Sequence, residues 1–293
     1  MTQRHAILAI YAHPDDEILG PGGSLARYAA LGTHVTLVTA TRGEAGEIQQ
    51  PGTATPETLP EVRQQELMCA AAALGIDEVI LLNYRDSGMA GTPENEHPRA
   101  FINIPDEVVV GRLVGIIRDY RPQVILTFEP YGGYGHPDHI VVNRHTVAAF
   151  HAAADPERFP DRGEPWQPER LFYPILPASL LHDIKERVAA HGGDTSGYDE
   201  LIEGREQSDE WEGDQVHAIV DVSAHVDQKW RAWHCHQTQF GPNSRFRRLP
   251  DDEMKELLSR EYFTLAYPEP PAPVIIHPLA GLFDPIPGRD RSA

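Results

Sequence analysis

Apolar and mixed segments alternate along the first half of the chain, and they predict strands and helices in turn. Four short segments are almost continuously apolar, which is typical of strands buried on both faces: AILAIYA (6–12), HVTLVTAT (34–41), EVILLN (78–83) and QVILTFEP (123–130). Three longer segments between them predict helices, at 22–32, 61–75 and 104–122. Buried strands separated by helices indicate an α/β fold with a mostly parallel sheet and helices on both faces.

The pattern weakens beyond residue 155. RLFYPIL (170–176) and QVHAIVDVS (215–223) predict strands, the segment 180–215 is polar and partly helical, and Asp227 to Gln239 predicts a helix. The segment from Pro268 onward is rich in proline, so we expect a tail that lies over the surface or is loosely ordered.

Two clusters of histidines and carboxylates follow strands of this predicted sheet. YAHPDDEILGPGG comes after the first strand, and PYGGYGHPDHI comes after the fourth. Ligands of such sheets bind beyond the carboxyl ends of the strands, where both clusters lie. His13 and Asp16 are three residues apart, as are His136 and His139, and this spacing puts two side chains on the same side of a turn.

A divalent cation would explain why these carboxylates lie so close together, because it offsets their mutual repulsion. Two imidazoles and one carboxylate leave a position for water, as in catalytic zinc sites, and a further carboxylate can accept a proton from that water. The alternative is structural, since Asp15 or Asp16 could only cap the following helix, and Glu17 suits its first turn. Two clusters at neighbouring strand ends favour the shared metal site.

A dinucleotide-binding loop at GPGGS (20–24) is a weaker reading of the same region. It lacks the G-x-G-x-x-G spacing, and the acidic residues before it would repel a pyrophosphate.

Composition narrows the classes of function further. The net charge of −19 argues against binding to nucleic-acid phosphates or anionic membranes. Cys69 and Cys235 are the only cysteines, so we expect neither a disulfide framework nor a CxxC zinc site. The apolar run among the first residues is too short for a signal peptide, and no segment approaches the roughly 20 apolar residues of a membrane span. A cytoplasmic protein is therefore expected.

AHPDDE (12–17) together with GGYGHPDH (132–139) resembles the LmbE-like, or PIG-L, family of zinc-dependent N-deacetylases. YRDSGMAGT (84–92), RFPDRGEPW (158–166) and HCHQTQ (234–239) are similar to stretches in the deacetylase and conjugate amidase of mycothiol metabolism. The resemblance implies a Rossmann-like catalytic core over 1–175. A C-terminal extension of the same domain, 176–267, would complete the pocket, and 268–293 would form the proline-rich tail.

The resemblance also implies a role for individual residues. The metal, Zn²⁺ or else Fe²⁺ or another divalent ion, would be bound by His13, Asp16 and His139. The catalytic groups would be Asp15 as general base, with protonated His136 and Tyr134 stabilising the oxyanion. The substrate would be held by Arg63, Asp86, His236 and Gln239.

The implied reaction is hydrolysis of the N-acetyl amide of a small molecule that contains N-acetylglucosamine, which releases acetate and a free amine. The aglycone could be inositol or malate, as in precursors of mycothiol and bacillithiol. The conjugate amidases carry a lysine shortly after the acidic cluster, where this chain has Ile18, Leu19 and Gly20, and this favours a deacetylase. The alternatives are an amidase of thiol S-conjugates, a chitooligosaccharide deacetylase and a metal-dependent sugar-binding protein. A homo-oligomer is neither indicated nor excluded.

Overall fold

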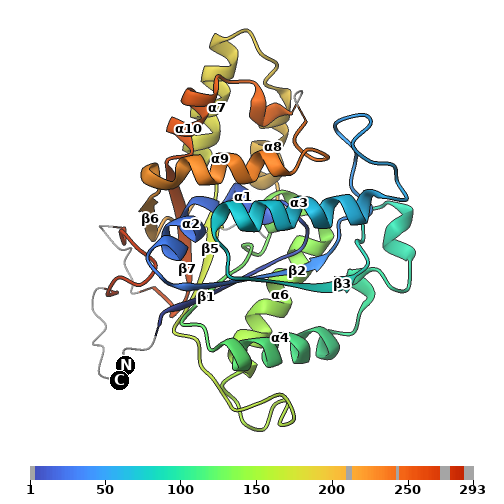
Figure 1. The fold of residues 1–293 in the computed structure, drawn as a ribbon, viewed down its shortest axis with the longest axis vertical. Coiled ribbons are helices and arrows are strands. Elements are labelled where there is room, and N and C mark those ends of the chain that lie inside the picture. Colours follow the sequence, from blue (N-terminus) through green and yellow to red (C-terminus); the bar gives the residue numbers. More distant parts are fainter. Residues whose placement is uncertain (1–3, 209–212, 242–243, 271–277, 287–293) are drawn as a thin grey trace.

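The computed structural model describes residues 4–208, 213–241, 244–270 and 278–286. Within them the chain forms one seven-stranded sheet with the order β3-β2-β1-β4-β5-β7-β6 (Figure 1). The strands are β1 (Ala6–Tyr11), β2 (His34–Thr41), β3 (Glu78–Tyr84), β4 (Val124–Leu126), β5 (Arg170–Ile175), β6 (Ala218–Asp221) and β7 (Arg260–Tyr267). The pairs among β1 to β5 are parallel, and β7 runs antiparallel to both β5 and β6.

Helices cover both faces of the sheet (Figure 1). Successive side chains of a strand point to opposite faces, so Leu8 and Ile10 pack with α4 (Asp106–Tyr120) and α6 (Pro137–Ala152). Ile7 and Ala9 pack on the other side with α2 (Gly22–Ala30) and α3 (Leu59–Leu74). Both sets are buried, which explains why β1 is apolar at every position.

A third layer of helices lies over α2 and α3. It consists of α9 (Val226–Cys235), which packs through Trp230 and Trp233, together with α7 (Ala178–Ala190), α8 (Ser196–Glu206) and α10 (Asp251–Leu257). The remaining short helices are α1 (Asp16–Leu19), α5 (Gly132–Gly135), η1 (Pro93–Glu96), η2 (Phe101–Asn103), η3 (Ser223–His225) and η4 (Arg245–Arg247).

The predicted α/β architecture is confirmed, and β2 has the predicted bounds. The fourth strand is shorter than predicted, because the chain leaves the sheet after Leu126 to form the loop that leads to α6. Neither α6 nor β7 was predicted from the sequence. Both elements have local features typical of their type. Pro137 lies in the first turn of α6, where proline is tolerated, and the side chains of β7 alternate between buried and half-buried.

The C-terminal region is integrated into this fold, because β6 and β7 extend the same sheet beyond β5. The expectation of a surface tail is wrong for 278–286. Leu279, Leu282 and Ile286 are buried in the core, and the carbonyl of Leu282 accepts a hydrogen bond of 2.6 Å from Arg170. The segments 271–277 and 287–293 lie outside the described residues. The division at residues 175 and 267 remains a prediction.

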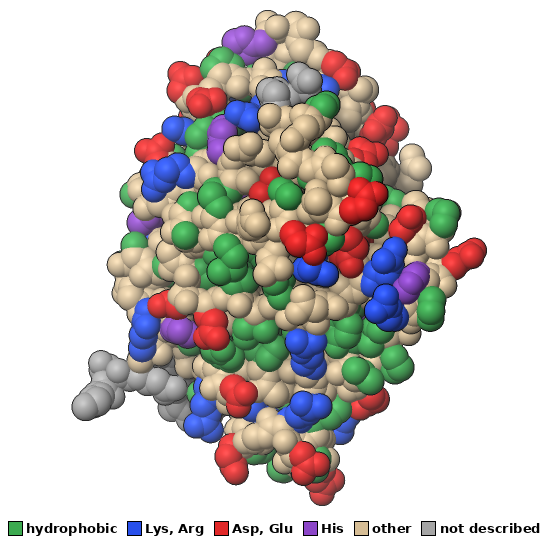
Figure 2. Space-filling model, turned by 45° about the vertical axis from the view of Figure 1, so that its right-hand side comes forward, with side chains coloured by type: hydrophobic (Ala, Val, Ile, Leu, Met, Phe, Trp, Pro, Cys, Tyr) green, Lys and Arg blue, Asp and Glu red, His purple; other side chains and the backbone are tan. Residues whose placement is uncertain are grey.

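No disulfide was expected from a chain with two cysteines, but the structure shows that they form one. Cys69 lies in α3 and Cys235 at the end of α9, and the close packing of these helices brings their Cα atoms to 5.7 Å. No helix among the described residues is both long enough and apolar enough to cross a bilayer. On the face drawn in Figure 2, basic side chains are interspersed with acidic and hydrophobic ones.

Candidate metal and active site

A cavity of about 610 Å³ opens at the carboxyl ends of the parallel strands. The loops after β1, β2, β3 and β4 and helix α3 contribute polar residues, and α8 and the segment after α9 add further side chains, among them Arg205 and Phe240. The cavity therefore lies where a parallel sheet binds its ligands, and the C-terminal region helps to line it.

The first cluster forms a tight turn between β1 and α1. The Oδ2 atom of Asp16 accepts hydrogen bonds from the backbone N–H groups of His13, at 2.7 Å, and Ala12, at 3.2 Å. These bonds fix the carboxylate and leave Oδ1 for another partner. That atom lies 3.4 Å from Nε2 of His139.

The second cluster begins α6. His136 is the N-cap, and its Nδ1 accepts a hydrogen bond of 3.1 Å from the backbone N–H of Asp138. His139 follows in the first turn, and its Nδ1 lies 2.9 Å from the carbonyl oxygen of Gly132. Gly132 has a φ of +73°, and a Cβ atom there would lie 2.6 Å from the Cβ of His139, so only glycine fits this position.

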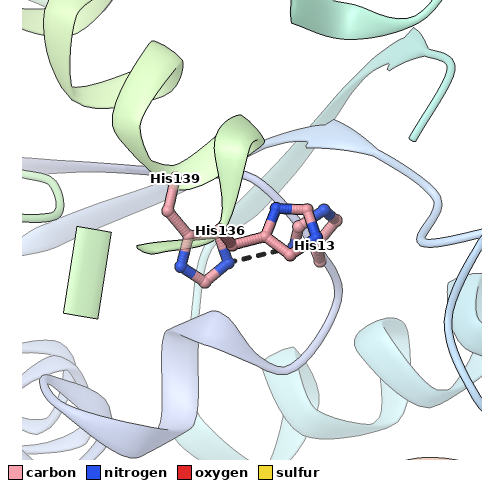
Figure 3. A group of neighbouring side chains, drawn as sticks. All are labelled: His13, His136 and His139. Atoms are coloured by element: carbon pink, nitrogen blue, oxygen red, sulfur yellow. Dashed lines mark hydrogen bonds between the residues drawn. The ribbon is translucent and has the colours of Figure 1, made fainter. Parts of the chain in front are cut away.

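The two clusters meet because β1 and β4 are neighbours in the sheet. Figure 3 shows the imidazoles of His13, His136 and His139 converging, and Nδ1 of His13 lies 3.1 Å from Nε2 of His139. On its other side, Nε2 of His13 faces Oδ2 of Asp138 at 3.2 Å and Oδ1 of Asp86 at 3.5 Å.

These contacts favour particular positions for the imidazole protons. The carboxylates favour the proton of His13 on Nε2, and the carbonyl of Gly132 favours the proton of His139 on Nδ1. The two nitrogens that face each other then both present lone pairs, with Oδ1 of Asp16 beside them. Such an arrangement fits a divalent cation, and hydrogen bonds to the outer nitrogens are typical of ligand histidines.

Other groupings of ligand atoms overlap with this one. Ligand atoms of His13, His136 and His139 lie within 4.8 Å of one another, as do those of His13, Asp86 and Asp138. The two aspartates of the second group also accept backbone hydrogen bonds from Gly88 and Ser87, so they are suited to orienting His13.

Burial and neighbouring charges shift the pKa values of the site. Burial lowers the pKa of His136 to about 2, and the neighbouring imidazoles of His13 and His139 disfavour a further positive charge there. His136 is therefore neutral. Because its Nδ1 accepts a hydrogen bond, its proton lies on Nε2, in place of the imidazolium that the sequence analysis expected. Burial raises the pKa of Asp15 to about 7, although Arg63 opposes the shift.

Asp15 is held at the cavity by Arg63. The Nη2 atom of Arg63 lies 3.1 Å from Oδ2 of Asp15 and donates to the carbonyl of Pro14 at 2.6 Å, while Nη1 donates to the carbonyl of Gly43 at 2.8 Å. Arg63 is only 3% exposed, so it is not a solvated surface residue of α3. It lines the cavity and restrains the carboxylate of Asp15 there.

The other predicted site residues differ in where they lie. Tyr134, Asp86 and Gln239 line the cavity, and the ring of Tyr134 lies 5.0 Å from that of His139. His236 is fully buried outside the cavity lining, where its Nε2 lies 2.6 Å from Oε1 of Glu17. In this structure His236 holds Glu17 and does not face the cavity.

Glu129 and Arg205 are among the charged residues of the cavity lining that were not predicted from the sequence. Glu129 accepts backbone hydrogen bonds from Tyr131 and Gly133 and so shapes the loop before α6. Arg205, in α8, donates to the carbonyl of Gly133 at 2.8 Å. Glu129 lies inside a segment already singled out and could have been found there, whereas Arg205 lies in a polar stretch without a motif.

Comparisons with known proteins identify a matching family model and sequence relatives. The family model PIG-L, described as GlcNAc-PI de-N-acetylase, matches residues 8–150. A 1D-myo-inositol 2-acetamido-2-deoxy-alpha-D-glucopyranoside deacetylase of Geodermatophilus obscurus is 38% identical over 274 residues, which cover 90% of this chain and 93% of that protein. The enzyme of the same name from Thermobifida fusca is 39% identical over 277 residues, with 90% and 94% covered.

Solved structures share the fold at lower identity. N,N'-diacetylchitobiose deacetylase from Pyrococcus horikoshii has a TM-score of 0.60 at 19% identity, with 90% of this chain and 84% of that chain covered. GalB, the 4-carboxy-2-hydroxymuconate hydratase from Pseudomonas putida KT2440, has the same TM-score at 16% identity, with 90% and 97% covered. The fold thus accommodates different reactions, and the sequence relatives carry the assignment. This chain belongs to the PIG-L, or LmbE-like, family.

Proposed function

We propose that this protein is a metal-dependent N-deacetylase of a small molecule that contains N-acetylglucosamine. The observation that carries the proposal is the convergence of His13, Asp16 and His139 in the lining of the cavity, to which Asp15 also belongs. The names of the sequence relatives support 1D-myo-inositol 2-acetamido-2-deoxy-alpha-D-glucopyranoside as the first substrate to test.

The metal would be held by Nδ1 of His13, Nε2 of His139 and Oδ1 of Asp16. Two imidazoles and one carboxylate suit Zn²⁺, which we propose as the native ion, and they also suit Fe²⁺. When bound, such a cation supplies Lewis-acid chemistry, which polarises an amide carbonyl and makes water more acidic.

The side chains of the site account for the proton transfers. Asp15 accepts a proton from the water whose oxygen attacks the acetyl carbon, and Arg63 keeps its carboxylate in place for this step. The neutral Nε2–H of His136 and the hydroxyl of Tyr134 donate hydrogen bonds to the oxyanion. The C–N bond then breaks, the protonated Asp15 returns its proton to the departing nitrogen, and acetate and a free amine leave.

The test is metal analysis of the purified protein followed by assays of amine release. The panel contains the N-acetylglucosaminides of inositol and malate, N,N'-diacetylchitobiose and a thiol S-conjugate. We expect one divalent ion per chain and release of amine from an N-acetylglucosaminide, which a chelator abolishes. Activity that persists after complete removal of the metal would refute the metal mechanism. Metal binding without amine release from any compound would indicate a sugar-binding protein.

A further inference from the structure

A buried carboxylate and imidazole lie directly behind the proposed general base. Glu17, in α1, and His236, after α9, have no exposed surface. The Oε1 atom of Glu17 lies 2.6 Å from Nε2 of His236, and neither residue belongs to the lining of the cavity. The chemistry proposed above uses neither of them, although they are close to its centre.

The backbone at Asp15 is in a conformation that residues with a Cβ atom rarely adopt. Its φ is 109° and its ψ is −20°. A non-glycine residue remains in such a conformation only where the surrounding structure holds it there, and these positions cluster at functional sites. The neighbours of Asp15 must therefore supply this restraint.

Both polar atoms of the peptide unit between Pro14 and Asp15 are held by buried side chains of opposite charge. The carbonyl oxygen of Pro14 accepts a hydrogen bond of 2.6 Å from Arg63. The N–H of Asp15 donates a hydrogen bond of 2.9 Å to Oε2 of Glu17. Since Glu17 uses its other oxygen for His236, the peptide is held through a chain that reaches the end of α9.

We propose that Glu17 and His236 are positioning residues, which hold the peptide of Asp15 so that its carboxylate faces the substrate. The proposal rests on the proposed function of Asp15 as general base. Glu17 restrains the peptide directly, and His236 fixes the rotamer of Glu17. Without Glu17 the N–H of Asp15 loses its acceptor, the backbone relaxes out of the left-handed region, and the carboxylate turns away from the reacting water.

The kinetic test compares Glu17→Ala with Glu17→Gln in the full, metal-loaded chain. In Glu17→Ala we expect kcat to fall about 10- to 100-fold, a part of what a general base contributes, with KM and metal content unchanged. Glu17→Gln should recover most of the loss, because its amide oxygen can still accept from the N–H of Asp15. Glu261→Gln, which alters a buried carboxylate outside the cavity, is the matched control and should keep kcat within about twofold.

Two variants of His236 test the same proposal if Glu17→Ala does not fold. His236→Leu removes the partner of Glu17, so kcat should fall in the same direction but less, while His236→Gln can still donate to Glu17 and should retain more activity. Wild-type kcat in Glu17→Ala, or in His236→Leu if Glu17→Ala fails to fold, would overturn the proposal. A raised KM at constant kcat would overturn it as well, because that result indicates direct substrate contact.

Crystal structures of the wild type and of these variants give a readout that needs no activity. Asp15 should leave the left-handed region in Glu17→Ala and stay there in Glu17→Gln. An unchanged Asp15 in Glu17→Ala would refute the positioning role. If the wild type released no amine from any compound, the proposed function would fail, while this comparison would still decide whether Glu17 holds the peptide.

Discussion

A buried ion pair between Lys229 and Glu261 connects the N-terminal turn with the C-terminal region. The Nζ atom of Lys229 lies 2.7 Å from Oε1 of Glu261, and the two residues are 1% and 2% exposed. The two carboxylate oxygens of Glu261 also accept the backbone N–H groups of Gly23 and Ser24 at the start of α2, each at 2.7 Å. Nζ of Lys229 donates to the carbonyl of Leu19 at 3.2 Å.

The substitution Lys229→Met removes the charge at nearly the same volume. Breaking a buried ion pair by removing one partner costs about 3–5 kcal/mol, because the other charge is left uncompensated. Glu261 would keep its two amide donors at the positive end of α2, so we expect a loss near the lower limit, about 3 kcal/mol.

The double variant Lys229→Met/Glu261→Gln separates the charge effect from the loss of contacts. It leaves no unpaired charge, although one amide of α2 loses its acceptor. We expect its loss to be smaller than the sum of the two single losses by at least about 1 kcal/mol.

The assay is urea denaturation of the metal-free chain, followed by tryptophan fluorescence and circular dichroism, so that metal binding adds nothing to the measured stability. The midpoint should fall while the slope with urea stays constant. A Lys229→Met variant within about 0.5 kcal/mol of the wild type would refute the reasoning, since such a value is typical of exposed ion pairs. Strict additivity in the double variant would refute it as well.

Four further predictions concern the site and the disulfide. Asp15→Asn should lower kcat by about 10²- to 10⁴-fold and keep the metal, because it removes the base and leaves the ligands in place; metal loss on elemental analysis would contradict this role. His139→Ala should lose both metal and activity, and a full metal content would exclude it as a ligand. Gly132→Ala should weaken metal binding in a competition titration, since its Cβ atom would lie 2.6 Å from that of His139, and wild-type affinity would show that the loop adapts. Replacing Cys69 and Cys235 by serine should lower the free energy of unfolding by about 2–5 kcal/mol, because the bond joins residues 166 positions apart; two free thiols in the unreduced wild type would rule the bond out.

The apolar pattern predicted the central part of the fold well, and for a clear physical reason. Strands of a parallel sheet are buried on both faces, so segments such as 6–12 are continuously apolar and stand out in a single sequence. In β7 only every second side chain is buried, and the strand lies after a region with a weak apolar pattern. Its sequence therefore indicates a strand less clearly. Burial of Leu279 and Leu282 could not be predicted, because it depends on a return of the chain to β6.

The candidate metal site could be predicted because its signals are local. The spacing of His13 and Asp16, and that of His136 and His139, already puts each pair on one turn, and each cluster follows a strand. The sheet order then brings the pairs together, since β1 and β4 are neighbours.

The sequence by itself determined the buried strands, the two turns rich in metal-binding side chains and the family to which they point. Only the tertiary structure decided which distant residues support them. Arg63 contacts Asp15, His236 contacts Glu17, Lys229 forms an ion pair with Glu261, and a disulfide joins Cys69 to Cys235. The members of these pairs are between 32 and 219 positions apart in the chain. Such partners are set by how α3 and α9 pack against the turn after β1, and no local pattern of residues encodes that packing.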